Sequence, residues 1–178
     1  MSATLYESAL VVLAPAAEPL VQAYRNEHDP AAALGVPAHL TVLYPFHPPG
    51  LAPAILARLA ALFAQCAPFD YALAELRRFP GVLYLAPEPE APFRALTRRV
   101  VAAFPDFPPY GGRFMDVIPH LTLAQLEDAG RLDRVAAHFQ AVCGARLPLR
   151  LRTEAVALMD NEQGAWRVCA TFPLGAQV

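Results

Sequence analysis

Hydrophobic and polar residues recur along the chain with the two periods that are typical of strands and amphipathic helices. Residues 5–13 are an apolar, β-branched stretch that predicts a strand, and residues 17–28 have the spacing of a helix that ends before Asp29-Pro30. A β-α pair is therefore expected first. The same patterns predict helices at about 53–65, 92–104 and 128–142, and strands at 39–42, 69–79, 82–86, 120–125, 147–158 and 165–172.

The turns support this order of elements. Pro80-Gly81 lies between two predicted strands and suits a type II turn, because glycine accepts the positive φ that the third turn position requires. Residues 31–38 are expected to form a loop, and residues 160–164 a turn that pairs the last strand with the one before it. The order in the first half recurs in the second. We interpret the recurrence as a duplication of approximately residues 1–80 and 81–178, inside one two-lobed domain of residues 1–178.

Two predicted strands carry nearly the same four residues, His39-Leu40-Thr41-Val42 and His120-Leu121-Thr122-Leu123. With 5 His in the chain, a chance His-x-Thr triplet is expected roughly 0.2 times. A single motif would be better explained as a buried strand whose imidazole binds a backbone carbonyl. A matched pair favours a functional site, because on a strand each His and Thr share one face and the apolar residues occupy the other.

Two imidazoles and two hydroxyls on neighbouring strands suit phosphoryl transfer. One imidazole can accept the proton of the attacking oxygen while the other gives a proton to the leaving oxygen. The hydroxyls of Thr41 and Thr122 can donate to the non-bridging oxygens, whose negative charge must be stabilised. With unperturbed imidazole pKa values, the optimum would lie at about pH 6 to 7.5.

The two motifs resemble the H-x-[ST]-x motifs of the 2H phosphoesterase superfamily, which includes the bacterial 2′-5′ RNA ligase-like (LigT-like) proteins, and the resemblance spans nearly the whole chain. It implies an α+β fold of two pseudo-symmetric lobes, each an antiparallel sheet with helices on its outer face, around a central cleft. It also implies metal-independent cleavage, or the reverse ligation, of 2′,3′-cyclic or 2′-5′-linked phosphodiesters of nucleotides or RNA ends. The catalytic residues would be His39, Thr41, His120 and Thr122.

Aromatic residues near both motifs could contact such a substrate. Residues 105–119 form a long Pro- and Gly-rich connection that leads into the second motif, and loops of this length often bind ligands. Aromatic side chains could stack a base and an arginine could pair with a phosphate, or the same side chains could simply pack the loops down. The candidate substrate-binding residues are Tyr44, Phe46, Tyr110, Arg113 and Phe114.

The charge of the chain limits how it could bind RNA. The net charge is −2, so we expect local contacts with an RNA end rather than a general basic surface. All 14 basic residues are arginines, and the absence of lysine excludes lysine-adenylate and Schiff-base chemistry. The rival interpretation is a non-catalytic RNA- or nucleotide-binding module that uses the same cleft.

The remaining features suggest a cytoplasmic protein. No uncharged apolar run approaches the 18 or more residues of a spanning helix, so no membrane association is expected. Three widely spaced cysteines among apolar residues fit buried free thiols of a reducing compartment. The sequence contains no Walker loop and no H-E-x-x-H or C-x-x-C metal motif, so no metal or cofactor is expected. No protein partner is implied, and the oligomeric state is left open.

Overall fold

Two four-stranded antiparallel sheets and the helices that cover them make up the computed structural model, which describes residues 6–46, 52–114 and 116–175. The strands are β1 (Ser8–Leu13), β2 (His39–Leu43), β3 (Phe69–Phe79), β4 (Val82–Glu88), β5 (Leu121–Gln125), β6 (Leu149–Thr153), β7 (Ala155–Asp160) and β8 (Arg167–Pro173). The helices are α1 (Glu18–His28), α2 (Pro30–Ala33), α3 (Pro53–Ala64), α4 (Ala91–Ala103) and α5 (Ala129–Cys143). The predicted α+β fold class is confirmed.

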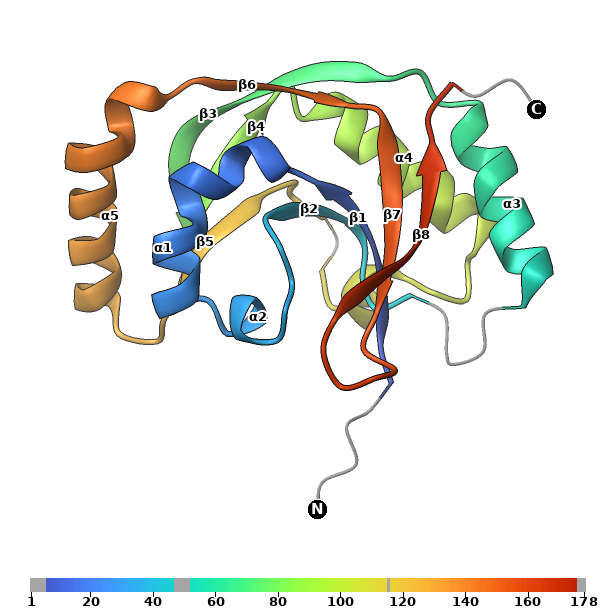
Figure 1. The fold of residues 1–178 in the computed structure, drawn as a ribbon, viewed down its shortest axis with the longest axis horizontal. Coiled ribbons are helices and arrows are strands. Elements are labelled where there is room, and N and C mark those ends of the chain that lie inside the picture. The colour runs from blue at the N-terminus through green and yellow to red at the C-terminus, as the bar shows by residue number, and fades with distance from the viewer. Residues whose placement is uncertain (1–5, 47–51, 115, 176–178) are drawn as a thin grey trace.

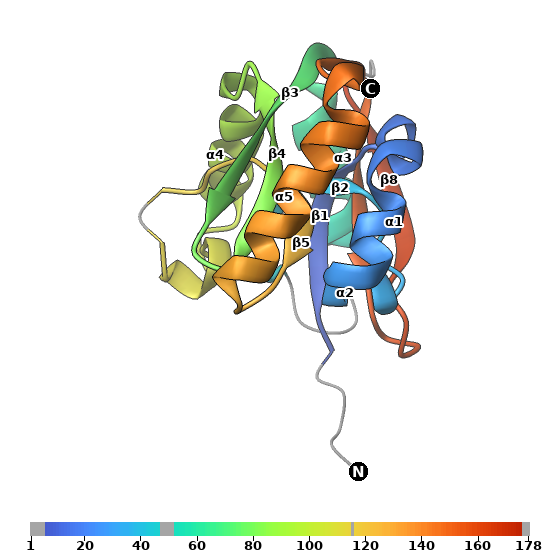
Figure 2. The ribbon, with the colours of Figure 1, turned by 90° about the vertical axis from the view of Figure 1, so that its left-hand side faces the viewer.

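Each motif belongs to a different sheet. The His39 sheet has the strand order β2-β1-β7-β8, and the His120 sheet, whose strand β5 follows His120 directly, has the order β5-β4-β3-β6. Both sheets combine strands from the two halves of the chain, since β3 lies beside β4, and β7 lies beside β1. Helices α3 and α4 pack against the His39 sheet, and in Figure 1 α4 lies behind β7 and β8 while α3 lies beside β8. Helices α1 and α5 pack against the His120 sheet and lie together in Figure 2.

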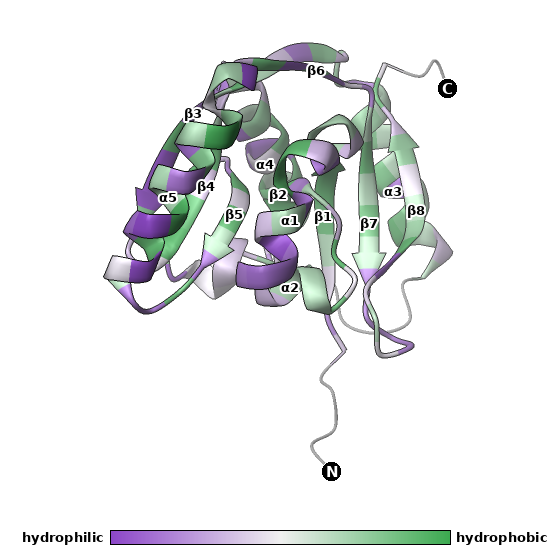
Figure 3. Ribbon diagram, turned by 60° about the vertical axis from the view of Figure 1, so that its left-hand side comes forward, coloured by the Kyte–Doolittle hydropathy of each residue, from purple (hydrophilic) through white to green (hydrophobic). Residues whose placement is uncertain are grey.

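Strand alternation divides the apolar side chains of β1 between two sides of the His39 sheet. Leu10 and Val12 belong to the main core, which also contains the buried faces of α1, α3, α4 and α5. Ala9 and Val11 point the other way and pack with Ala157 and Met159 of β7 in a smaller cluster. Figure 3 shows the result, with β1 and β7 largely hydrophobic and α1 and α5 mixed along their length. The helices thus cover one face of the sheets and leave the other for the site.

Most predicted elements are present within a residue or two, and the expected Pro80-Gly81 turn is present, with Gly81 at φ +77°. The start of the first predicted strand, Leu5, lies outside the described residues. The predicted 31–38 loop begins with the short helix α2, whose first turn is capped by the Asp29 carboxylate accepting from the Ala31 N–H at 3.0 Å.

The prediction of one strand over residues 147–158 is wrong. The chain instead forms β6 up to Thr153 and β7 from Ala155, and the two strands belong to different sheets. The burial pattern explains the break, because β6 alternates half-buried leucines with exposed arginines, whereas β7 is buried almost throughout. A strand at the edge of a sheet and a strand inside one require these different patterns. The final strand does pair with β7, as expected.

A side-chain hydrogen bond joins the two halves of the chain near the first motif. The Thr97 hydroxyl of α4 donates to the Val42 carbonyl of β2 at 2.8 Å. Strand β2 is at the edge of its sheet, so this bond satisfies a backbone group there.

We expect Thr97→Val to lower the free energy of unfolding by about 1 kcal/mol, because valine keeps the shape of threonine but cannot donate the bond. Urea denaturation monitored by circular dichroism would measure the change. Thr97→Ser keeps the hydroxyl and is the matched control, expected to lose less stability. Equal stability of Thr97→Val and the parent protein would show that the bond contributes nothing.

Candidate active site

Both histidines and both threonines of the motifs line one cavity, which has a volume of about 490 Å³. Leu40 and Val42 beneath the first motif, and Leu121 and Leu123 beneath the second, are fully buried in the main core. Because side chains alternate along a strand, the imidazole and hydroxyl of each motif are turned to the opposite face. The two sheets therefore bring together two imidazoles and two hydroxyls that are far apart in sequence.

Both imidazoles are held in the same way. The Nδ1 of His39 lies 2.8 Å from the Pro37 carbonyl oxygen, and the Nδ1 of His120 lies 2.7 Å from the Ile118 carbonyl oxygen. A carbonyl can only accept, so Nδ1 carries the hydrogen in both rings. In a neutral imidazole this leaves Nε2 without a proton and able to accept one. Each ring is thus prepared as a base, and becomes an acid at the same atom when it is protonated.

Burial makes both imidazoles hard to protonate. It lowers the pKa of His39 from 6.5 to about 4, with the Arg25 cation and His120 acting in the same direction, against opposing effects of the Pro37 carbonyl and Asp29. Burial also lowers the pKa of His120, against the raising effect of its bond to Ile118. The unperturbed imidazole pKa expected from the sequence is therefore wrong for both residues. Both rings are neutral at pH 7 when the cavity holds no anion.

The two imidazoles have different surroundings. The ring of His120 packs edge-on against two aromatic rings, with centroid distances of 5.3 Å to Phe79 and 5.5 Å to Tyr84. These two rings stack on each other at 4.3 Å, so they form a firm apolar support. His39 instead lies near the buried ion pair of Arg25 and Asp29, whose charges both act on its pKa.

Three aromatic side chains form part of the cavity wall beside the first motif. Tyr44 lies at 6.2 Å from Tyr110 and at 6.3 Å from Trp166 between ring centroids, and all three line the cavity. The Tyr44 hydroxyl donates to Glu7 Oε1 at 2.8 Å, and burial together with this carboxylate raises the pKa of Tyr44 to about 12. The Tyr110 N–H donates to the Tyr44 carbonyl at 2.6 Å, which holds Tyr110 at the unusual φ of 51°.

The structure does not bring all the predicted substrate-binding residues to the cavity. Tyr44 and Tyr110 line it, but Phe46 is only 4% exposed and packs with Phe104 and Phe107 in the interior. Phe114 is 60% exposed and contacts the ring of Tyr110 from outside, and Arg113 is also exposed; neither lines the cavity. The placement of Phe46 follows from its ring contacts with Phe104 and Phe107 in the interior, which no local pattern reveals.

Sequence reasoning missed several residues of the cavity wall, among them Glu7, Asp29, Gln125 and Trp166. Trp166 is the single tryptophan of the chain and follows a predicted turn, and these two features could have marked it as a candidate binding residue. Gln125 ends the strand that carries Thr122, and its position close to the motif could have marked it as a candidate as well. Glu7 and Asp29 had no such signal, because they reach the cavity only through the pairing of β1 with β2 and through the loop around α2.

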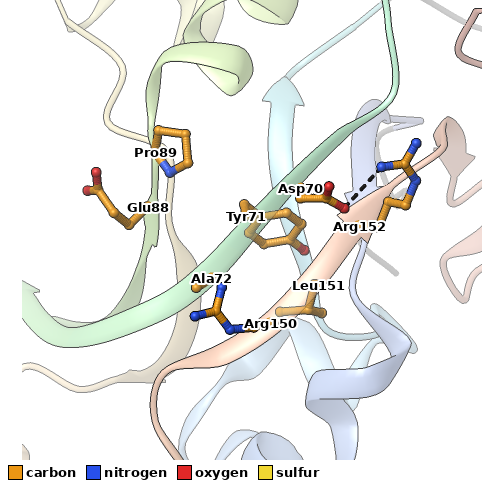
Figure 4. Close-up of a pocket in the computed structure, with 8 residues that line it drawn as sticks. All are labelled: Asp70, Tyr71, Ala72, Glu88, Pro89, Arg150, Leu151 and Arg152. Atoms are coloured by element: carbon orange, nitrogen blue, oxygen red, sulfur yellow. Dashed lines mark hydrogen bonds and ion pairs between the residues drawn. The ribbon is translucent and has the colours of Figure 1, made fainter.

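A second hollow of about 560 Å³ lies on the outer face of the His120 sheet, where β3 meets β6 (Figure 4). Its polar side chains include Glu88 and Arg150, and Asp70 accepts from Arg152 at 3.0 Å across it. Its walls contain neither histidine motif. The chemistry predicted from the motifs is therefore concentrated in the cavity between the sheets.

The sequence also led to expectations about the cysteines, metal binding and membrane-spanning helices. The cysteines are free; Cys66 and Cys143 are buried as expected, but Cys169 on β8 is exposed. Within the described ranges, His, Cys, Asp and Glu side chains form no group of three that could hold a metal ion. None of the helices placed in the structure has the length and apolar character needed to cross a membrane.

An α+β fold with two histidine motifs facing one cavity between two sheets defines a two-histidine phosphoesterase class. The sequence matches the 2′-5′ RNA ligase superfamily over residues 12–165, and the chain belongs to that superfamily. Among curated proteins, none matches the sequence.

Similar solved structures have the same fold. TT0787 of Thermus thermophilus has a TM-score of 0.58 and 19% identity, over 97% of this chain and 100% of that one. E. coli LigT complexed with 3′-AMP has a TM-score of 0.57 and 15% identity, over 97% and 100%. A structure described only as a phosphoesterase has a TM-score of 0.58 and 16% identity, over 97% and 100%.

The lowered pKa of His39 makes the stability of the protein depend on pH. Between pH 6.5 and about 4 the unfolded chain binds a proton at His39 that the folded protein does not, so stability should be complete above pH 6.5 and should fall as the pH decreases through this window. We expect a loss of no more than about 3 kcal/mol from this residue.

Urea denaturation of the parent protein and of His39→Ala at pH 7 and pH 4.5 would test this. His39→Ala should weaken the pH dependence. Leu13→Ala, which removes a side chain opposite His39 on β1 without removing an ionisable group, should keep it. If His39→Ala and the parent lose stability equally on acidification, His39 is not the group responsible.

Proposed function

We propose that the protein is a metal-independent phosphoesterase that acts on 2′,3′-cyclic or 2′-5′-linked phosphodiesters of nucleotides or RNA ends. The observation that carries the proposal is the presence of two imidazoles, held in the same tautomer, and two threonines on the wall of one cavity. Membership of the 2′-5′ RNA ligase superfamily supports phosphoester chemistry of this kind.

We assign the general base to His39 and the general acid to His120. Burial and the Arg25 cation lower the pKa of His39 to about 4, whereas Arg25 has no such effect on His120, so the first proton goes to His120. The negative charge of a bound phosphodiester favours that proton further. Both transfers occur at Nε2, because Nδ1 of each ring is occupied by its backbone carbonyl.

In hydrolysis of a cyclic phosphate, His39 accepts a proton from the attacking water as the new P–O bond forms. His120 gives its proton to the ribose oxygen as the old P–O bond breaks. The hydroxyls of Thr41 and Thr122 donate to the non-bridging oxygens and stabilise their charge. In ligation a ribose 5′-hydroxyl attacks the cyclic phosphate in place of water, with His39 again as the base and His120 as the acid. In the reverse of that step, cleavage of the 2′-5′ bond, the two histidines exchange roles.

The aromatic wall supports a nucleoside as the rest of the substrate. Tyr44, Tyr110 and Trp166 offer ring surface on one side of the cavity, and aromatic rings stack nucleobases of any sequence. E. coli LigT has been solved in complexes with 3′-AMP, NADP⁺ and ATP, which are all nucleotides. A cavity of about 490 Å³ has the size of a small-molecule site, so we expect a nucleotide or the terminal nucleotide of an RNA to occupy it.

Removing either imidazole should abolish most of the turnover. We expect His39→Ala and His120→Ala each to lower kcat for 2′,3′-cyclic AMP by roughly 10²- to 10⁴-fold, and the double variant to lose much less than the product of the two. Thr41→Ala and Thr122→Ala should each lower kcat by up to about 10²- to 10³-fold, since each removes one donor to the phosphate.

His138→Ala is the matched control, because His138 lies on α5 and hydrogen-bonds to Tyr24 outside the cavity. It should keep parental turnover. A panel of 2′,3′-cyclic nucleotides and 2′-5′-linked oligoadenylates, with product identification, would define the substrate. If all four site variants still bind nucleotide and none of the proteins turns over any substrate, the non-catalytic binding module is the better interpretation.

The pH dependence of kcat/KM should follow the pKa values of the free histidines. Activity should rise as His39 loses its proton near pH 4 and fall as His120 loses its own, below the ordinary imidazole value of 6.5. The maximum should therefore lie on the acid side of pH 6.5, below most of the range expected from unperturbed histidines.

The optimum of kcat should lie at higher pH than that of kcat/KM, because the bound phosphodiester favours protonated His120. Assays should contain EDTA throughout. A kcat/KM maximum above pH 6.5 would contradict the assignment of acid and base. Loss of turnover in EDTA, restored by a divalent cation, would contradict the metal-independent mechanism.

A further inference from the structure

An arginine side chain holds the backbone just before each motif histidine. Before His39, the Arg25 guanidinium donates to the Val36 carbonyl at 2.9 Å. Before His120, the Arg94 guanidinium donates to the Val117 carbonyl at 3.0 Å. In both cases the arginine-bound carbonyl is three residues before the histidine, and the next residue supplies the carbonyl that accepts from the histidine Nδ1.

Carboxylates fix each arginine in turn. Arg25 pairs with Asp29 through Nε at 3.0 Å and Nη2 at 2.9 Å, and both side chains are only 3% exposed. Arg94 pairs with Glu90 through Nε at 3.2 Å and Nη2 at 2.9 Å, and also with Asp116. A planar guanidinium can bind a carboxylate with one edge and still donate to a carbonyl, which a single ammonium group cannot do with the same geometry.

The segment before His39 is tied down at every polar backbone group. Its remaining bonds run from the Val36 N–H to the Ala31 carbonyl, from the Ala38 N–H to Glu18, and from the Ala14 N–H to the Ala38 carbonyl. Arg25 supplies a bond to the Val36 carbonyl, directly before the carbonyl that orients the imidazole. Loss of that bond would leave a half-buried carbonyl without its donor and allow the 36–37 peptide to rotate.

We propose that Arg25 and Arg94 are positioning residues for His39 and His120. Each arginine holds a backbone carbonyl so that the next carbonyl can accept from the histidine Nδ1, which aims Nε2 into the cavity. The expected effect of the arginines on turnover rests on the proposed function. Their expected effect on the tautomers of His39 and His120 does not depend on it. Neither arginine lines the cavity; both act through the backbone, and Arg25 also acts on the pKa of His39 through its charge.

Loss of Arg25 should destabilise the folded protein more than loss of Arg94. Removing Arg25 alone would leave the Asp29 carboxylate buried without its partner, which is strongly destabilising. The useful variant is therefore Arg25→Met with Asp29→Asn, because asparagine still caps α2 and no buried charge remains. Arg94 is 26% exposed, so Arg94→Met is expected to fold.

The experiment combines steady-state kinetics with NMR of the imidazole nitrogens in the ligand-free protein. We expect Arg94→Met to lower kcat by roughly 10-fold with KM changed by less than about 3-fold, since a misaligned group costs turnover more than binding. The ¹⁵N spectrum of the parent should show the Nδ1–H tautomer for both histidines. In Arg94→Met, His120 should show a mixture of tautomers while His39 is unchanged.

The other variants complete the test. In the ¹⁵N spectrum Arg25→Met/Asp29→Asn should give the mirror result, with His39 affected and His120 unchanged; because Asp29 lines the cavity, this variant is judged by the tautomer and not by KM. Arg94→Lys should recover part of the lost turnover through its single ammonium group. Arg152→Met is the matched control, because Arg152 forms an exposed ion pair with Asp70 of β3 and does not line the cavity. It should change neither kcat nor either imidazole.

Two results would overturn the proposal. One is an unchanged Nδ1–H tautomer at both histidines in both arginine variants. The other is an equal disturbance of both imidazoles by either variant, which would indicate a general loss of packing. Failure of the proposed function has a different signature. Either the parent protein turns over no substrate, or His39→Ala and His120→Ala keep the parental turnover, and in both cases the tautomer measurements in the ligand-free protein still test the positioning roles.

Discussion

The alternation of side chains on a β-strand constrains both motifs in the same way. Within five residues, strand β2 must place Leu40 and Val42 in the main core and must turn His39 and Thr41 to the cavity. A shift of one residue would bury the imidazole and expose the leucine, so the register of the core and the geometry of the site are fixed together. The helices can cover only one face of the sheets without closing the cavity.

This arrangement leaves the catalytic candidates half-buried in the wall of the cavity, and much of their chemistry follows from that position. Burial lowers the pKa of both imidazoles, and it also requires each Nδ1–H to find a partner. The backbone carbonyls of Pro37 and Ile118 satisfy this requirement, and by doing so they select the tautomer that leaves Nε2 free. A hydrogen bond that stabilises the fold therefore also sets which atom can transfer a proton.

The sequence predicted those features that depend on local pattern. The paired motifs and most helices and strands could be found from periodicity, because adjacent residues on one face share one environment. The break between β6 and β7 at Glu154 could not be predicted in this way. It depends on the pairing of β6 with β3 in one sheet and of β7 with β1 in the other, which are contacts between distant parts of the chain. Phe46 was mistaken for a cavity residue and Trp166 was overlooked for the same reason, since their positions are decided by tertiary contacts.

Two nearly identical motifs do not make two identical histidines. His120 is supported by the apolar rings of Phe79 and Tyr84, whereas His39 lies near the charges of Arg25 and Asp29. The letters of the motif fix the type of side chain and its face, but the neighbouring elements decide how readily each ring accepts a proton. If a duplication produced the two halves, the difference between the two imidazole pKa values was set by residues outside the repeated tetrapeptides. The residues that contact the segments directly before His39 and His120 are therefore the ones most able to change how each imidazole behaves.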